Sequence, residues 1–150
     1  GTAWAWGSNT LGSLGIASPY SRDSPNQIGA LTNWATVTAS QSLTPAIKTD
    51  GTAWAWGTNS GGQLGDGTTT VRSSTVQIGS LTNWASISAG LVTSYAVKTD
   101  GTLWAWGTAA SGALGNGTVT PNLSSPVQIG SAATWASVSG GIAYAIATQT

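Results

Sequence analysis

The sequence predicts an all-β, propeller-type fold built from three tandem repeats of about 50 residues each. Three observations lead to this prediction: a fixed period, short strand-like runs bounded by turn residues, and nine regularly spaced tryptophans. Periods of this size are typical of propellers and solenoids. Apolar residues at helical spacing are nowhere sustained, which disfavours helical repeats.

The repeat is defined by three motifs that return in the same order. They are Trp-Ala-Trp-Gly (4–7, 54–57, 104–107), Gln-Ile-Gly (27–29, 77–79, 128–130) and a Trp-Ala pair (34–35, 84–85, 135–136). We therefore divide the chain into repeats 1–50, 51–100 and 101–150, and expect them to belong to a larger propeller or ring. The third repeat gains one residue between 117 and 127 and loses two between 141 and 145, so both segments are predicted to be loops.

Each repeat contains four strand-like runs. In the sheet that starts late in the second repeat they are 84–89, 94–99, 102–107 and the short run 126–129. Asp100-Gly101 separates the second run from the third, as Asp50-Gly51 does one repeat earlier. This dipeptide predicts two-residue hairpin turns, because both residues can adopt positive φ.

The order of these runs predicts four-stranded antiparallel blades with half blades at both ends. Residues 2–29 supply a third and a fourth strand, two complete sheets follow, and residues 135–148 supply a first and a second strand. The two ends are therefore complementary halves of one blade. A single chain closed on itself would have three blades, below the usual range of about four to eight. Two chains in a ring would give six blades and three chains would give nine.

Tryptophan and alanine alternate in the third strand of each blade. In an extended strand Trp4 and Trp6 lie on one face, and Ala3 and Ala5 lie on the other. Large residues on one face and small ones on the other suit stacked sheets, since the indoles of one sheet can fill the alanine face of the next. We predict that the paired tryptophans 4/6, 54/56 and 104/106 are largely buried, and that Trp34, Trp84 and Trp135 open the neighbouring strands.

The composition removes most catalytic chemistry. There is no His, Cys or Met, and the charged residues are four Asp, two Lys and two Arg. No nucleophile and base pair, metal site or cofactor site is expected. A net charge of zero disfavours a nucleic-acid partner, and no apolar run is long enough for membrane insertion. The sparse charge, the missing Cys and Met and the Thr, Ser, Gly and Ala-rich surface lead us to expect an extracellular, cell-surface or virion-exposed setting.

The glycine-rich segment 61–67 is interpreted as a structural loop. A phosphate cradle needs a helix N-terminus and a lysine, whereas here a threonine run and another strand follow. We expect Leu64 to plug the core while Asn59 and Gln63 bind backbone groups. Leu14 and Leu114 should have the role of Leu64 in their own repeats.

A family resemblance rests on three runs of the second repeat: Gly-Thr-Ala-Trp-Ala-Trp-Gly (51–57), Asn-Ser-Gly-Gly-Gln-Leu-Gly-Asp-Gly (59–67) and Val-Gln-Ile-Gly (76–79). They resemble the bacterial-type consensus of the regulator-of-chromosome-condensation repeat family. The resemblance implies a seven-bladed β-propeller with four-stranded blades. Its members include an exchange factor for a GTPase, a β-lactamase inhibitor and an ultraviolet photoreceptor, so it does not imply one activity. The family's Gly-x-x-His-Ser segment is altered here, with Ser40 in place of the glycine and Leu43 and Thr93 at histidine positions.

We therefore expect a non-enzymatic structural or protein-interaction module, a rigid propeller scaffold of a surface, fibre or virion-type assembly. The alternative is a soluble inhibitor or adaptor that binds a partner through loops on the propeller face. The loop residues available for such contacts are Tyr20, Arg22, Asp23 and Arg72.

The expected partner is protein, either another copy of the chain or flanking repeats of the same polypeptide. The edges at 2–7 and 143–148 are uncharged and apolar, and such edges rarely stay unpaired. The residues predicted to mediate closure are Thr2, Trp4, Trp6, Ala143, Ala145 and Thr148.

Overall fold

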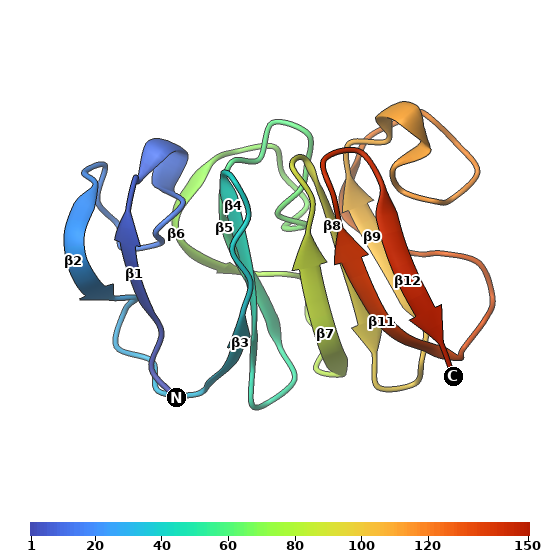
Figure 1. Cartoon of the computed structure of the whole chain (residues 1–150), viewed down its shortest axis with the longest axis horizontal. Coiled ribbons are helices and arrows are strands. Elements are labelled where there is room, and N and C mark those ends of the chain that lie inside the picture. The colour runs from blue at the N-terminus through green and yellow to red at the C-terminus, as the bar shows by residue number, and fades with distance from the viewer.

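The computed structural model describes all 150 residues as four antiparallel sheets that stand side by side (Figure 1). Two complete four-stranded sheets lie in the middle, and a two-stranded sheet lies at each end. The predicted blades and terminal half blades are therefore confirmed. The structure contains no helix that is long and apolar enough to cross a membrane.

The strands follow the chain order within every sheet. The first half blade contains β1 (Trp4–Gly7) and β2 (Arg22–Gln27), and the last contains β11 (Trp135–Gly140) and β12 (Ala145–Gln149). The first full blade contains β3 (Trp34–Val37), β4 (Leu43–Lys48), β5 (Ala53–Gly57) and β6 (Arg72–Gln77). The second contains β7 (Trp84–Ala89), β8 (Thr93–Lys98), β9 (Leu103–Gly107) and β10 (Leu123–Gln128). Two 3-10 turns, η1 (Thr10–Gly12) and η2 (Ala110–Gly112), lie in the long loops of the first and third repeats.

The Asp-Gly pairs lie in hairpin turns, as predicted, but the turns have three residues rather than two. Lys48 N–H donates to Thr52 O at 3.0 Å, and Gly51 N–H donates to Lys48 O at 3.0 Å. Thr49 and Asp50 are thus the central residues of the tight turn, and Gly51 follows with φ +76°. This is the three-residue hairpin in which a left-handed residue forms a bulge. The aspartate stays in the turn because its Oδ1 accepts the Thr52 amide.

The outer strand of each blade begins earlier than the sequence predicted. The strand β10 starts at Leu123 rather than at Pro126, with an irregular register between Leu123 and Val127. In the same way Arg22, Asp23 and Arg72 lie in β2 and β6 rather than in loops. The prediction was wrong because these strands lack the alternation of apolar and polar residues by which strands are recognised.

The inserted residue of the third repeat lies in the loop before β10, as predicted, but the predicted two-residue deletion is absent. Gly140 pairs with Ala145 and Trp135 pairs with Gln149, as Ala89 pairs with Ser94 and Trp84 with Lys98. The hairpin has the same length in both repeats. The paired register makes Ile146 the equivalent of Tyr95, since Ile146 pairs with Ser139 as Tyr95 pairs with Ser88.

The core consists of three clusters between successive sheets, and two of them join the alanine face of one sheet to the tryptophan face of the next. Ala53 and Ala55 of the first full blade pack with Trp84 and Trp106 of the second. Ala3 of the first half blade packs with Trp34 and Trp56. The interdigitation predicted from the alternating tryptophans and alanines is confirmed at these interfaces.

Candidate interaction site

The residues predicted to mediate closure lie at opposite ends of the row of sheets (Figure 1). Trp4 and Trp6 belong to β1, and Thr2 precedes this strand. Ala145 and Thr148 belong to β12, whereas Ala143 lies in the turn before it. Both strands have a free edge, since β1 pairs only with β2 and β12 only with β11.

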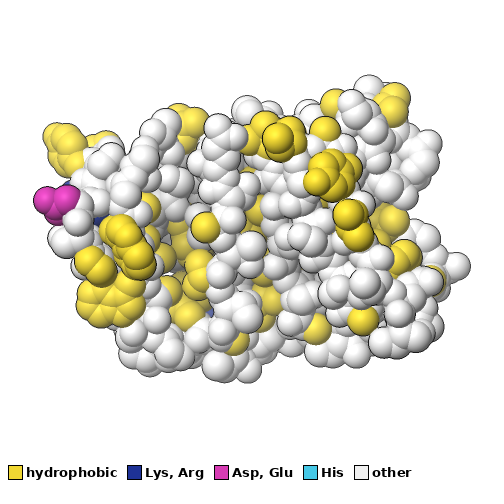
Figure 2. Space-filling model, in the orientation of Figure 1, with side chains coloured by type: hydrophobic (Ala, Val, Ile, Leu, Met, Phe, Trp, Pro, Cys, Tyr) yellow, Lys and Arg dark blue, Asp and Glu magenta, His cyan; other side chains and the backbone are white.

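The indoles of β1 are exposed, contrary to prediction. Trp4 is 51% exposed and Trp6 is 60% exposed, while Trp56 and Trp106 are fully buried. The alternation of side chains is as expected, but the tryptophan face of each sheet packs on the sheet before it, and none precedes β1. In Figure 2 a hydrophobic group accordingly marks the end of the molecule formed by β1 and β2. Trp34 and Trp84 open their strands and are buried, and Trp135 opens β11 and is half-buried.

Trp56 and Trp106 each occupy a pocket built by the preceding blade. Trp56 Nε1 donates to Ser13 O at 2.9 Å, and its ring lies edge-on to Trp34 at 5.9 Å between centroids. Gly15 forms the floor of this pocket, because a Cβ at that position would lie 2.6 Å from Trp56 Nε1. The glycine is required twice, for this close approach and for its φ of +68°.

The second full blade repeats this pocket with the same parts. Trp106 Nε1 donates to Gln63 O at 3.0 Å, and a Cβ on Gly65 would lie 2.6 Å from the same nitrogen. Trp106 lies 6.0 Å from Trp84 between ring centroids. The predicted core role of Leu64 is confirmed, as are the bonds from the Leu64 amide to Asn59 and from the Gly61 amide to Gln63.

A third pocket exists at the far end but contains no indole. A cavity of about 470 Å³ is lined by Leu114, Gly115, Ile129 and Trp135 among others. A Cβ on Gly115 would meet nothing nearer than Ile129 Cγ2 at 3.7 Å, so the space filled by an indole in the other two pockets is open. The missing component is the third strand of the last blade.

In each full blade a lysine covers the ring of a tryptophan. Lys48 Nζ lies 3.4 Å from the ring centroid of Trp54, and Lys98 Nζ lies 3.5 Å from that of Trp104. Burial lowers the pKa of both ammonium groups, and Asp50 and Asp100 oppose this shift in part. The register gives the equivalent position in β12 to Gln149, which is uncharged.

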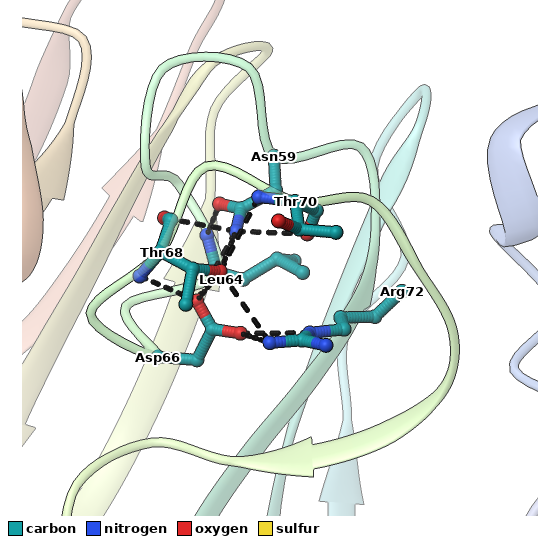
Figure 3. Close-up of polar contacts among 6 residues, drawn as sticks. All are labelled: Asn59, Leu64, Asp66, Thr68, Thr70 and Arg72. Carbon is teal, nitrogen blue, oxygen red and sulfur yellow. Dashed lines mark hydrogen bonds and ion pairs between the residues drawn. The ribbon is translucent and has the colours of Figure 1, made fainter.

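The loop residues predicted to contact a partner are partly engaged inside the chain. Arg72 forms an ion pair with Asp66 at 2.8 Å, and Asp66 also accepts hydrogen bonds from Thr68 and Asn59 (Figure 3). This network closes the loop over Leu64. In the first repeat Tyr20 is 72% exposed, and Arg22 bonds to polar groups of its own loop and strand without a carboxylate partner.

The arrangement offers apolar packing and backbone pairing at both ends of the chain. No three His, Cys, Asp or Glu side chains gather at one place. Sequence reasoning found the two edges but missed the pocket around Gly115. Two features of the sequence could have revealed this pocket. A glycine follows a leucine at 15, 65 and 115, and the lysine at 48 and 98 is replaced by glutamine at 149.

Comparison with known proteins agrees with this architecture. A family model described as the regulator of chromosome condensation (RCC1) repeat matches residues 1–47, 50–97 and 100–147. No curated protein matches the chain.

Three solved structures share the fold. Prp20p from Saccharomyces cerevisiae, studied for its binding to Gsp1p and histones, is 18% identical with a TM-score of 0.86 over 97% of this chain and 39% of that chain. Human WBSCR16 is 17% identical with a TM-score of 0.83, over 97% and 39% of the two chains. Yeast RCC1 (Prp20) bound to Kap60 is 18% identical with a TM-score of 0.82, over 97% and 37%. The chain thus spans about two fifths of the length of these proteins.

Proposed function

Because the chain belongs to the RCC1 repeat family, we propose that it is a non-enzymatic protein-interaction module, a rigid segment of β-propeller whose open ends combine with further RCC1 blades. These blades come from another copy of the chain or from flanking repeats. The partner binds the two half blades, and the two full blades between them keep their relative position fixed.

The observation that carries this proposal is the complementarity of the two ends. One end presents exposed indoles on β1, and the other presents an open edge on β12 beside a cavity that lacks an indole. An apolar edge strand left free is a site of strand addition. Protein is therefore the proposed class of partner, without nucleic acid or membrane insertion.

The proposed setting is a surface, fibre or virion-type assembly outside the cell. Its support is compositional: four acidic and four basic side chains in 150 residues, and no cysteine. The histone binding described for Prp20p is not carried over, because a basic partner calls for an acidic surface and this chain has no net charge.

An inhibitor or adaptor that acts through its face loops is the second candidate. The observation in its favour is Tyr20, which is exposed on a loop next to the unpaired guanidinium of Arg22. It ranks lower because binding energy concentrates in clustered anchors, and the matching arginine of the next repeat, Arg72, is bound to Asp66.

A tandem fusion tests the proposal. One aspartate inserted between Thr150 of one copy and Gly1 of the next recreates the Thr-Asp-Gly-Thr turn found at 49–52 and 99–102. The fusion should complete one internal blade, so it should unfold at a temperature several degrees above that of the single chain when both are measured at a dilution where the single chain is monomeric.

Amide hydrogen exchange locates the change. Strand β12 of the first copy should be protected in the fusion even at a dilution where the single chain is monomeric and its own β12 exchanges freely. A fusion that unfolds like the monomeric single chain, with β12 of its first copy exchanging as freely as in that chain, would contradict the proposal.

A further inference from the structure

We propose that the cavity beside Gly115 is an indole socket that receives Trp6 of a second copy of this chain, while β1 of that copy pairs with the free edge of β12. This inference rests on the proposed function and names its partner. It assigns a binding site that combines a pocket, a strand edge and an exposed apolar face.

The socket has the components that hold Trp56 and Trp106 in the full blades. Leu114 and Ile129 correspond to Leu64 and Ile78, which are buried beside the occupied pocket. Gly115 has φ +70°, close to the +76° of Gly65, yet it is exposed whereas Gly65 is buried. An indole in this cavity would give Trp135 the tilted ring contact that Trp84 makes with Trp106 at 6.0 Å between centroids.

The socket contains a backbone carbonyl that can accept a hydrogen bond from an indole N–H. The carbonyl groups that receive the indole N–H in the full blades belong to Ser13 and Gln63, and the equivalent group is Ala113 O. Ala113 O accepts one hydrogen bond from the Tyr95 hydroxyl at 2.8 Å. A carbonyl oxygen can accept two, so it can also receive Trp6 Nε1–H.

The register of the new strand pair follows from the two full blades. Ser94 pairs with Trp106 and Tyr95 with Ala105, just as Thr44 pairs with Trp56 and Pro45 with Ala55. The same register places Ala145 opposite Trp6 and Ile146 opposite Ala5 of the second copy. It also turns Trp6 toward the socket, because a shift by one residue would turn it away.

A second pair of exposed side chains meets when the copies join. Val138 of β11 and Tyr95 of β8 belong to one buried cluster between adjacent sheets. The equivalent residues at the open ends are Val37 of β3, 44% exposed, and Ile146 of β12, 66% exposed. In the joined blade Ile146 of one copy covers Val37 of the other.

A second copy fits better than an unrelated strand because it supplies every missing part at once. It brings an edge strand in register, an indole for the socket and Val37 for Ile146, and no charged residue lies among them. Two copies joined at both ends make six blades, within the usual range for propellers. The interface is head-to-tail, which closes only as a ring.

Molar mass in solution is the first test. Light scattering of the 150-residue chain should give at least twice the 14.9 kDa of one chain at micromolar concentration. Trp6→Ala should remain folded, since Trp6 is exposed in the single chain, but its dissociation constant should rise at least about 30-fold. Leu81→Ala is the control, because it removes an exposed apolar side chain from the loop between the two full blades, away from both ends, and should leave the mass unchanged.

Disulfide trapping tests the register. The chain has no cysteine, so Ala5→Cys with Ile146→Cys introduces the only thiols. Under mild oxidation this pair should link copies covalently, whereas Ala5→Cys with Ala145→Cys should not, because Ala145 points to the opposite face.

The outcomes separate this inference from the proposed function. A wild-type chain that stays monomeric overturns the second copy as partner, and the stabilised tandem fusion would then leave the proposed function standing. Association that survives Trp6→Ala, or equal trapping by the two cysteine pairs, overturns the indole socket and its register.

Discussion

At the scale of single residues, Asp66 is the only carboxylate in the chain that forms an ion pair. Burial raises the pKa of this carboxyl, but the hydrogen bonds from Thr68 and Arg72 outweigh burial and hold the pKa below its usual value. A depressed pKa in the folded state contributes stability above the unfolded pKa, near 3.9, which is lost as the pH falls. The Asp66 network therefore makes the loop sensitive to acid.

Asp66→Asn should lower the free energy of unfolding at pH 7 by about 1 kcal/mol, because it removes the ion pair with a half-exposed arginine. The turn itself should survive, since Asn116 accepts the Thr118 amide and hydroxyl in the third repeat. Urea unfolding should show the difference from wild type shrinking as the pH falls from about 5 toward 2. A difference independent of pH would show that the carboxylate charge is not involved.

Trp56 and Trp6 have equivalent positions but opposite surroundings. Trp56→Ala should cost about 3 to 5 kcal/mol, because it empties a fully buried pocket. Trp6→Ala should cost less than about 1 kcal/mol when measured at a concentration where the chain is monomeric. Equal losses in urea unfolding would mean that Trp6 is already buried within a single chain.

At the scale of elements, the sequence predicted the strands whose residues alternate and missed those that do not. The runs opened by Trp34, Trp84 and Trp135 begin where predicted, because a large indole on one face and small residues on the other define a two-residue period. Strand β10 pairs through its backbone while Leu123 and Pro126 flank a polar pair, so no period marks its start. The turn length was missed for a related reason, since Asp-Gly fits both two-residue and three-residue hairpins.

Gly51→Ala should destabilise the fold by about 3 kcal/mol. Its φ is +76°, and a Cβ would lie 2.1 Å from Thr82 O, so backbone must move. Gly29→Ala is the matched control, because Gly29 has φ +60° with nothing within 4 Å of a Cβ and should cost only about 1 kcal/mol of strain. Thermal unfolding that ranks the two variants equally would contradict the close approach of this turn to Thr82 O.

At the scale of the whole molecule, the sequence predicted the sheets and their half blades, because repeat periodicity fixes strand order. The recurring Leu-Gly pair at 14–15, 64–65 and 114–115 marks a pocket in each repeat, but it does not specify which pocket an indole fills. That depends on whether a third strand from a neighbouring blade packs against the pocket.

The proposed assembly should be insensitive to salt. The side chains at its junction are uncharged, and the termini at Gly1 and Thr150 add only an exposed pair worth less than about 1 kcal/mol, so raising NaCl from about 0.05 M to about 0.5 M should leave the molar mass unchanged. Dissociation over this range, measured by light scattering, would instead indicate ion pairs through Arg22 or Asp23.

Gln149 makes the junction between copies the least stable part of the proposed ring. In each full blade a lysine ammonium lies over an indole, Lys48 over Trp54 and Lys98 over Trp104, an attraction of about 0.5 to 2 kcal/mol. The blade shared by two chains has glutamine there and lacks that attraction. A ring of two copies would therefore have two weak junctions at fixed positions. Heating or dilution would separate the copies at these junctions first, while the blades formed within one chain stay folded.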